Sequence, residues 1–269
     1  GYLVLGSTGE CASLTDDESA ALVKTAREAA APGKMIMVGT ARESTKQTIE
    51  FTKRSADLGA DAALVRTPSY FKGKMTRDVL KAYYIEVADA SPIPTIIYNV
   101  PQNTGITLEG ALIVELSAHP NIAGLKESGG NIVLAAELIP RLPADFCYLP
   151  GHGSVFLPAL VLGASGAILA VADAAPNICV EIFERFKAGR IADAAHLHQA
   201  AGLVPGIRLR DEEDQVTAGL HPGVHADVAV SQGHRARAVR ARRVPDDVVS
   251  VQALQGRRLA CGEPRDRPG

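Results

Sequence analysis

The chain has 269 residues, of which 46% are hydrophobic, and its formal net charge at pH 7 is −2. This length allows one large domain with a substantial core, and the near-neutral charge gives no electrostatic argument for nucleic acid or a membrane surface as a partner. No apolar run approaches the roughly 18 to 20 residues of a membrane-spanning helix. The four cysteines are far apart and show no C-x-x-C spacing, so we expect that they bind no metal and remain free thiols. Free thiols are typical of proteins of the cytoplasm or an organelle matrix, and we expect this location.

Short β-rich runs alternate with helical stretches along residues 1–190. The predicted strands are four or five residues long and rich in aliphatic side chains, and they cover 2–5, 35–38, 62–65, 95–98, 122–125, 146–149 and 167–171. Each is followed by a stretch with helical patterning, over 15–30, 45–58, 77–89, 108–116, 131–140, 154–162 and 176–187.

Several of these helices carry start signals. Thr15 and Glu18 have the spacing of a capping box, and Pro176 suits the first position of a helix. Thr107 stands before another predicted helix, and Ser154 is predicted to cap the one that reaches residue 162.

Strands that alternate with helices predict parallel pairing and right-handed crossovers. Seven repeats are one fewer than in an eight-stranded barrel. Because the chain begins at Gly1 inside a strand-like run, we expect residues 1–190 to be an α/β (β/α)8 TIM barrel that lacks its first strand and helix.

Residues 191–269 are predicted to form a separate region, helical at its start and irregular afterwards. From residue 201 onward there is no lysine, aromatic residue or methionine, while eleven arginines remain. These arginines face nine acidic residues and no aromatic side chain that could stack on bases, so nucleic-acid binding is not favoured. Irregular structure, or a reading frame shifted after about residue 200, would explain the change.

Chemically suited side chains occur where the predicted strands end. Lys126 follows a buried run, where an amine loses solvent and becomes nucleophilic near neutral pH, although most lysines are simply exposed. Ser7 and Thr8 form a turn with donors suited to a carboxylate, or an ordinary strand-to-helix turn. Tyr98 could place its hydroxyl at the rim of the core, and Tyr70, in a long loop, could be only a surface contact.

Four motifs in this sequence resemble the dihydrodipicolinate synthase / N-acetylneuraminate lyase family, in order and spacing, from residue 1 to about 200. They are Gly6-Ser-Thr-Gly-Glu10, Tyr98-Asn-Val-Pro101, Gly124-Leu-Lys-Glu-Ser128 and Gly163-Ala-Ser-Gly-Ala-Ile168. The family consists of Schiff-base, pyruvate-dependent aldolases and lyases built on an eight-stranded barrel. The resemblance implies a carbon–carbon lyase that needs no cofactor beyond the imine on its lysine, acts on a small 2-oxo acid such as pyruvate, and forms a tetramer as a dimer of dimers.

The resemblance also implies roles for single residues. Lys126 would be the Schiff-base lysine and Tyr98 the proton donor and acceptor. Thr8 would relay protons between Tyr98 and a tyrosine of the neighbouring subunit, here Tyr70. The substrate would contact Ser7, Thr8, Gly9, Asn103, Ser128, Gly151 and the carbonyl of Ile168.

The second substrate depends on the branch of the family. The synthase places an arginine where this chain has Asn103, and Asn cannot supply the charge that grips a carboxylate. The turn Pro101-Gln-Asn-Thr-Gly105 is similar to the 4-hydroxy-2-oxoglutarate aldolase branch, which cleaves its substrate into pyruvate and glyoxylate, and we favour that branch. The alternatives are the synthase, which condenses pyruvate with aspartate semialdehyde, and an inactive barrel fragment without turnover.

Overall fold

Six parallel strands form one sheet in the order in which they occur along the chain. The computed structural model describes residues 1–201, so the irregular region expected after that point lies outside the described residues. The strands are β1 (Tyr2–Val4), β2 (Ile36–Gly39), β3 (Ala62–Arg66), β4 (Thr95–Asn99), β5 (Ile122–Glu127) and β6 (Cys147–Pro150). Within residues 1–201 the sheet stays open, with β1 and β6 at its two edges.

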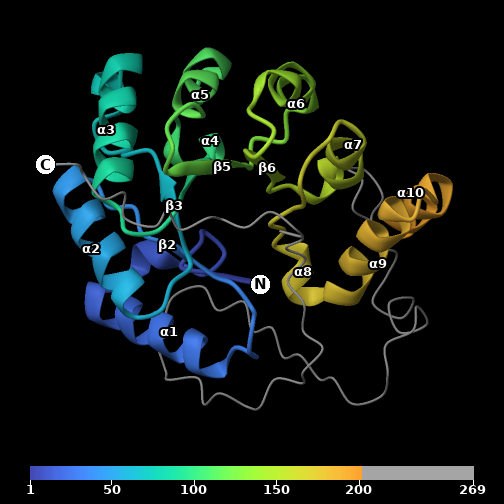
Figure 1. Cartoon of the computed structure of the whole chain (residues 1–269), viewed down its shortest axis with the longest axis horizontal. Helices are drawn as coiled ribbons and strands as arrows, with labels where there is room; N and C mark the ends of the chain where they lie inside the picture. The colour runs from blue at the N-terminus through green and yellow to red at the C-terminus, as the bar shows by residue number, and fades with distance from the viewer. Residues whose placement is uncertain (202–269) are drawn as a thin grey trace, which may run out of the picture.

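Helices follow the strands, most of them in an arc on the outer side of the curved sheet (Figure 1). They are α1 (Asp16–Ala29), α2 (Thr45–Asp57), α3 (Arg77–Ala90), α4 (Pro101–Thr104), α5 (Gly110–Leu116), α6 (Ile132–Leu138), α7 (Phe156–Val161), α8 (Val171–Ala174), α9 (Pro176–Lys187) and α10 (Ile191–Ala200). The capping box of Thr15 and Glu18 at α1 is confirmed, as is Pro176 in the first turn of α9. The predicted barrel architecture is therefore present as an open, TIM-barrel-like sheet with helices outside.

The predicted strand at 167–171 is wrong. Two backbone hydrogen bonds do reach β6 here, from the amide of Ser165, just before this segment, to the carbonyl of Tyr148, and from the amide of Ile168, within it, to that of Pro150. The chain then turns at Val171 into the short helix α8, so no strand forms. A short apolar run fits a buried strand and a buried helical turn equally well, and periodicity does not separate the two.

Two predicted helix starts are also wrong. Ser154 lies inside a 3-10 turn over Gly153–Val155, and its hydroxyl bonds the ring of His152 instead of a helix amide. Helix α5 begins two residues later than expected, after Glu109, and no side chain caps it.

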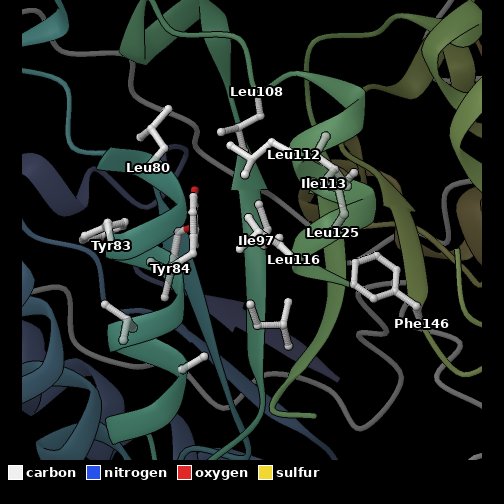
Figure 2. Packing of buried hydrophobic residues seen from close by; sticks show 14 of the residues in the cluster. Leu80, Tyr83, Tyr84, Ile97, Leu108, Leu112, Ile113, Leu116, Leu125 and Phe146 are labelled. Atoms are coloured by element: carbon white, nitrogen blue, oxygen red, sulfur yellow. The ribbon is translucent and has the colours of Figure 1, made fainter. Parts of the chain in front are cut away.

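The main core lies between the sheet and its outer helices (Figure 2). Ile97 and Leu125 project outward from β4 and β5 and pack against Leu112 of α5. The hydroxyl of Tyr84, on α3, donates a hydrogen bond to the carbonyl of Val65. Because side chains alternate along a strand, the residues between these outward ones face the inner side of the sheet.

A smaller apolar cluster fills that inner side, with Leu64, Ile96, Tyr98, Leu149 and Ile168 among its buried members. Among the described residues, no helix has both the length and the apolar character needed to cross a membrane. The same residues contain no group of three His, Cys, Asp or Glu side chains that could hold a metal ion.

Candidate active site

Lys126 lies on the inner side of β5 and is buried, with only 7% of its surface exposed. Loss of solvent lowers the pKa of its amine to about 8, and the negative charge of Asp173 opposes part of this shift. At pH 7 about a tenth of such an amine is neutral, far more than for an ordinary lysine. The residue therefore has the property that a Schiff-base nucleophile requires.

Tyr98 connects Lys126 to the rest of the site. It pairs in register with Lys126 across β4 and β5, and the Lys126 Nζ lies 4.5 Å from the centre of the Tyr98 ring. The Tyr98 hydroxyl lies 3.3 Å from the Oγ of Ser7, which belongs to the turn after β1. Three strands thus bring an amine, a phenol and a hydroxyl together at one end of the sheet.

The partner of Tyr98 is Ser7, where the sequence predicted Thr8. Thr8 is exposed and makes no side-chain hydrogen bond within residues 1–201. Leu5 bends the chain just before this turn with a φ of 58°, a left-handed conformation that residues other than glycine seldom adopt. A Cβ at Gly39 would lie 1.9 Å from the Leu5 carbonyl oxygen, so only glycine accommodates this bend.

Gly151 and Ser128 surround the side chain of Lys126. A Cβ at Gly151 would lie 1.9 Å from the Oγ of Ser128 and 3.2 Å from the Cε of Lys126. Any larger residue at this position would displace both side chains. The structure thus brings these two predicted site residues next to the lysine.

A cavity of about 210 Å³ opens beside Ser7 and Tyr98. Its wall includes Asn103 and Thr104 from α4, and also Arg66 from the end of β3. Of the predicted site residues, Ser7, Tyr98 and Asn103 line this cavity. Lys126 is not part of this lining, and its Nζ lies over the ring of Tyr98, which is.

The remaining predicted residues stand farther out or make other contacts. Tyr70 is 79% exposed, and its ring packs edge-on against Phe71. Its predicted role needs a neighbouring subunit, which a single chain does not test. Gly9 is exposed in the turn after β1, and Ile168 is buried in the inner cluster with its amide bonded to Pro150.

Sequence reasoning missed three charged residues near the site. Arg66 is the last residue of β3, one position beyond the predicted strand, and alternation along that strand would have placed it inward. Asp173 lies in α8, two residues beyond the segment that was predicted as a strand. Glu127, next to Lys126, is buried, and its carboxylate accepts hydrogen bonds from Asn99 and the Gly129 amide.

Comparison with known proteins agrees with this geometry. A model of the dihydrodipicolinate synthetase family matches residues 1–216. The chain belongs to this family. Its members are carbon–carbon lyases of the Schiff-base, class I aldolase type, and the present chain is a pyruvate-dependent aldolase of the dihydrodipicolinate synthetase family.

Curated relatives carry the synthase name. The chain is 36% identical over 222 residues to a 4-hydroxy-tetrahydrodipicolinate synthase from Exiguobacterium, covering 82% of this chain and 72% of that protein. It is also 36% identical over 201 residues to the synthase of Listeria welshimeri, covering 74% and 68% of the two chains. These names agree better with the synthase alternative than with the 4-hydroxy-2-oxoglutarate aldolase branch that the sequence favoured.

Solved structures of family members have the same architecture. A dihydrodipicolinate synthase from Bacillus anthracis superposes with a TM-score of 0.70 at 29% identity, over 74% of this chain and 68% of that one. The prophage protein YagE of E. coli K12, solved in complex with pyruvate, superposes with a TM-score of 0.70 at 30% identity, over 74% of this chain and 67% of that one. The open sheet of this dihydrodipicolinate synthetase family member is therefore the part of the fold that it shares with them.

Proposed function

We propose that this chain joins pyruvate to a carboxylate-bearing aldehyde through a Schiff base on Lys126. The observation that carries the proposal is the buried Lys126 amine, with its pKa lowered to about 8, beside the ring of Tyr98. The pyruvate complex of YagE, which has the same fold, supports the first substrate.

The reaction would begin with attack of the neutral Lys126 amine on the keto carbon of pyruvate. Tyr98 would donate its phenolic proton to the departing hydroxyl, so that water leaves and a protonated imine remains. The imine withdraws electrons from the adjacent methyl group, and the Tyr98 phenolate accepts the proton that this group releases. The resulting enamine attacks the aldehyde carbon, the new alkoxide takes a proton, and water then releases the product from Lys126.

Ser7 would support the phenol in these transfers. Its hydroxyl lies within hydrogen-bond distance of the Tyr98 hydroxyl, so it stabilises the phenolate when Tyr98 has lost its proton. We accordingly assign to Ser7 the relay that the sequence assigned to Thr8. Contacts of Ser128 and the Ile168 carbonyl with the substrate, and a Tyr70 from a neighbouring subunit, remain part of the proposal.

Aspartate semialdehyde is the first candidate for the aldehyde, because curated relatives with 36% identity are 4-hydroxy-tetrahydrodipicolinate synthases. Glyoxylate is the second candidate, because Asn103 on the cavity wall carries no charge. Glyoxylate would make the chain a 4-hydroxy-2-oxoglutarate aldolase. Both aldehydes carry a carboxylate.

The test compares consumption of pyruvate with each aldehyde by the purified full chain. We expect turnover with aspartate semialdehyde to exceed turnover with glyoxylate, and Lys126→Arg to remove both, because a guanidinium forms no imine at neutral pH. Faster turnover with glyoxylate would support the second candidate. A folded protein that consumes pyruvate with neither aldehyde, or that keeps its activity after Lys126→Arg, would contradict the proposed function.

A further inference from the structure

Arg66 lies on the inner face of the sheet, beside the proposed catalytic residues. Ala62 and Leu64 of β3 belong to the inner cluster, so alternation directs Arg66 to the same side. Arg66 pairs in register with Tyr98, which pairs in turn with Lys126. Because neighbouring strands lie about 4.8 Å apart, the Cα atoms of Arg66 and Lys126 are separated by roughly 10 Å.

The cavity beside Tyr98 has a single cationic side chain on the wall that the structure describes. That side chain is Arg66, which is partly exposed, at 24%. Asn103, also on this wall, is neutral, and Glu10 is the acidic residue there. A substrate carboxylate entering this cavity would therefore find its positive partner at Arg66.

Glu43 fixes one end of the Arg66 guanidinium. The Nη1 of Arg66 donates to the Oε1 of Glu43 at 2.9 Å and to the carbonyl of Thr67 at 3.0 Å. Glu43 is itself held by hydrogen bonds from the amides of Ser69 and Tyr70. The guanidinium is thus oriented before any substrate arrives.

The other side of the guanidinium remains available. Within residues 1–201 the Nε and Nη2 atoms of Arg66 make no hydrogen bond. These two atoms form one edge of the planar group, and their parallel N–H bonds match the two oxygens of a carboxylate.

We propose that Arg66 binds the carboxylate of the aldehyde substrate and makes this site selective for carboxylate-bearing aldehydes. This inference rests on the proposed function, because it concerns the second substrate of the same site. Arg66 would supply the charge that Asn103 lacks, from β3 instead of from α4. Glu43 is then a positioning residue, since it orients the guanidinium and does not reach the substrate itself.

The test separates charged from uncharged aldehydes. We would measure kcat and KM for aspartate semialdehyde, glyoxylate and the uncharged glycolaldehyde, with pyruvate saturating, in the unsubstituted chain and in Arg66→Gln. Loss of a charge-assisted bidentate contact predicts a fall of about 10- to 100-fold in kcat/KM for the charged aldehydes, mostly through KM. With glycolaldehyde the expected change is less than about threefold.

Two further variants control the comparison. Arg54→Gln removes a surface ion pair between α2 and α1, with Asp17, and should leave all three aldehydes unaffected. Arg66→Lys keeps the charge without the planar fork, so we expect a smaller loss, confined to the charged aldehydes. If Arg66→Gln does not fold, Arg66→Lys provides the same comparison.

A binding measurement gives a result even if turnover is slow. The protein is first trapped with pyruvate and borohydride, and glycolate, an unreactive relative of glyoxylate, is then titrated by calorimetry. We expect glycolate to bind the unsubstituted chain and Arg54→Gln with equal affinity. Its affinity for Arg66→Gln should be at least fivefold lower.

The outcomes distinguish the two proposals. Equal losses for charged and uncharged aldehydes, or unchanged glycolate binding in Arg66→Gln, would overturn the role of Arg66 while leaving the Schiff-base chemistry intact. Failure of the unsubstituted chain to form the pyruvate adduct would overturn the proposed function itself.

Discussion

The two faces of the same sheet differ in what they bury. The outer face packs Ile97, Leu125 and their neighbours against helices, in a cluster made of aliphatic and aromatic side chains. The inner face is also apolar at its middle, but the last inward-facing residues of β3, β4 and β5 are Arg66, Tyr98 and Lys126. One face therefore holds the fold together, and the rim of the other bears groups whose burial costs stability and creates reactivity.

Two tyrosines illustrate the difference. On the outer side, the hydroxyl of Tyr84 bonds a backbone carbonyl, and complete burial raises its pKa well above the ordinary value. On the inner side, the hydroxyl of Tyr98 meets the side chain of Ser7 beside a cavity. The first phenol stays protonated as part of the core, whereas the second has a hydroxyl partner and access to a substrate.

The largest contrast is expected from neighbouring residues of β5 that face opposite sides. Lys126→Met should lower turnover at least about 10⁴-fold, because no imine can form, while stability stays equal or rises once the desolvated amine is gone. Leu125→Ala should lower the free energy of unfolding by about 2–5 kcal/mol and leave activity per folded molecule within a few-fold. Steady-state kinetics and urea unfolding measure both; a large loss of stability in Lys126→Met would be inconsistent with this division.

The tyrosine pair provides a second test of intermediate size. Tyr98→Phe should reduce kcat by about 10²- to 10⁴-fold through loss of the proton carrier. Tyr84→Phe should cost about 1 kcal/mol of stability with little change in kcat, because only one hydrogen bond is lost. If the two substitutions reduced kcat equally, Tyr98 would have no special role.

The stability of the fold should also depend on the protonation of Lys126. Its pKa is about 8 in the folded chain and near 10.5 when unfolded, so between these values the unfolded chain binds more protons. Relative to Lys126→Met, the free energy of unfolding should therefore rise with pH over this window, by up to about 3 kcal/mol. Parallel unfolding curves at pH 7.5 and pH 10 measure the difference, and a constant difference would show that Lys126 is not desolvated.

The smallest contrast concerns two adjacent hydroxyls. Ser7→Ala should lower kcat by about 2- to 10-fold, the value of one hydrogen bond, because the Tyr98 hydroxyl loses its partner. Thr8→Val should have a smaller effect, since the Thr8 side chain makes no hydrogen bond to Tyr98 within the described residues. A larger effect of Thr8→Val than of Ser7→Ala would show that Thr8 is the proton relay, as the sequence predicted.

The sequence was sufficient for the parts of this molecule that periodicity controls. Alternating runs gave β1 to β6 and the longer helices within a few residues, and the ends of β4 and β5 brought Tyr98 and Lys126 together as expected. It was insufficient at 167–171, where one apolar pattern fits two backbone conformations. Parallel strands place their last residues at one edge of a sheet, so site residues at strand ends can be predicted from the sequence.

Details that depend on the backbone conformation of one or two residues could not be predicted from the sequence. Ser7, and not Thr8, contacts Tyr98 in a turn that follows the left-handed Leu5, and a leucine in the sequence does not predict that conformation. Arg66 was overlooked because β3 extends one residue further than its apolar run. Strand alternation, continued by that one residue, would have placed Arg66 beside Tyr98.

The most direct measurement is the pH dependence of borohydride-trapped adduct formation with pyruvate, located by peptide mass spectrometry. We predict a single adduct, on Lys126, whose rate of formation rises about tenfold per pH unit below pH 8 and levels off above it, once the amine is mostly neutral. Absence of the adduct, its appearance on another lysine, or a rate that continues to rise toward pH 10.5 would contradict the account.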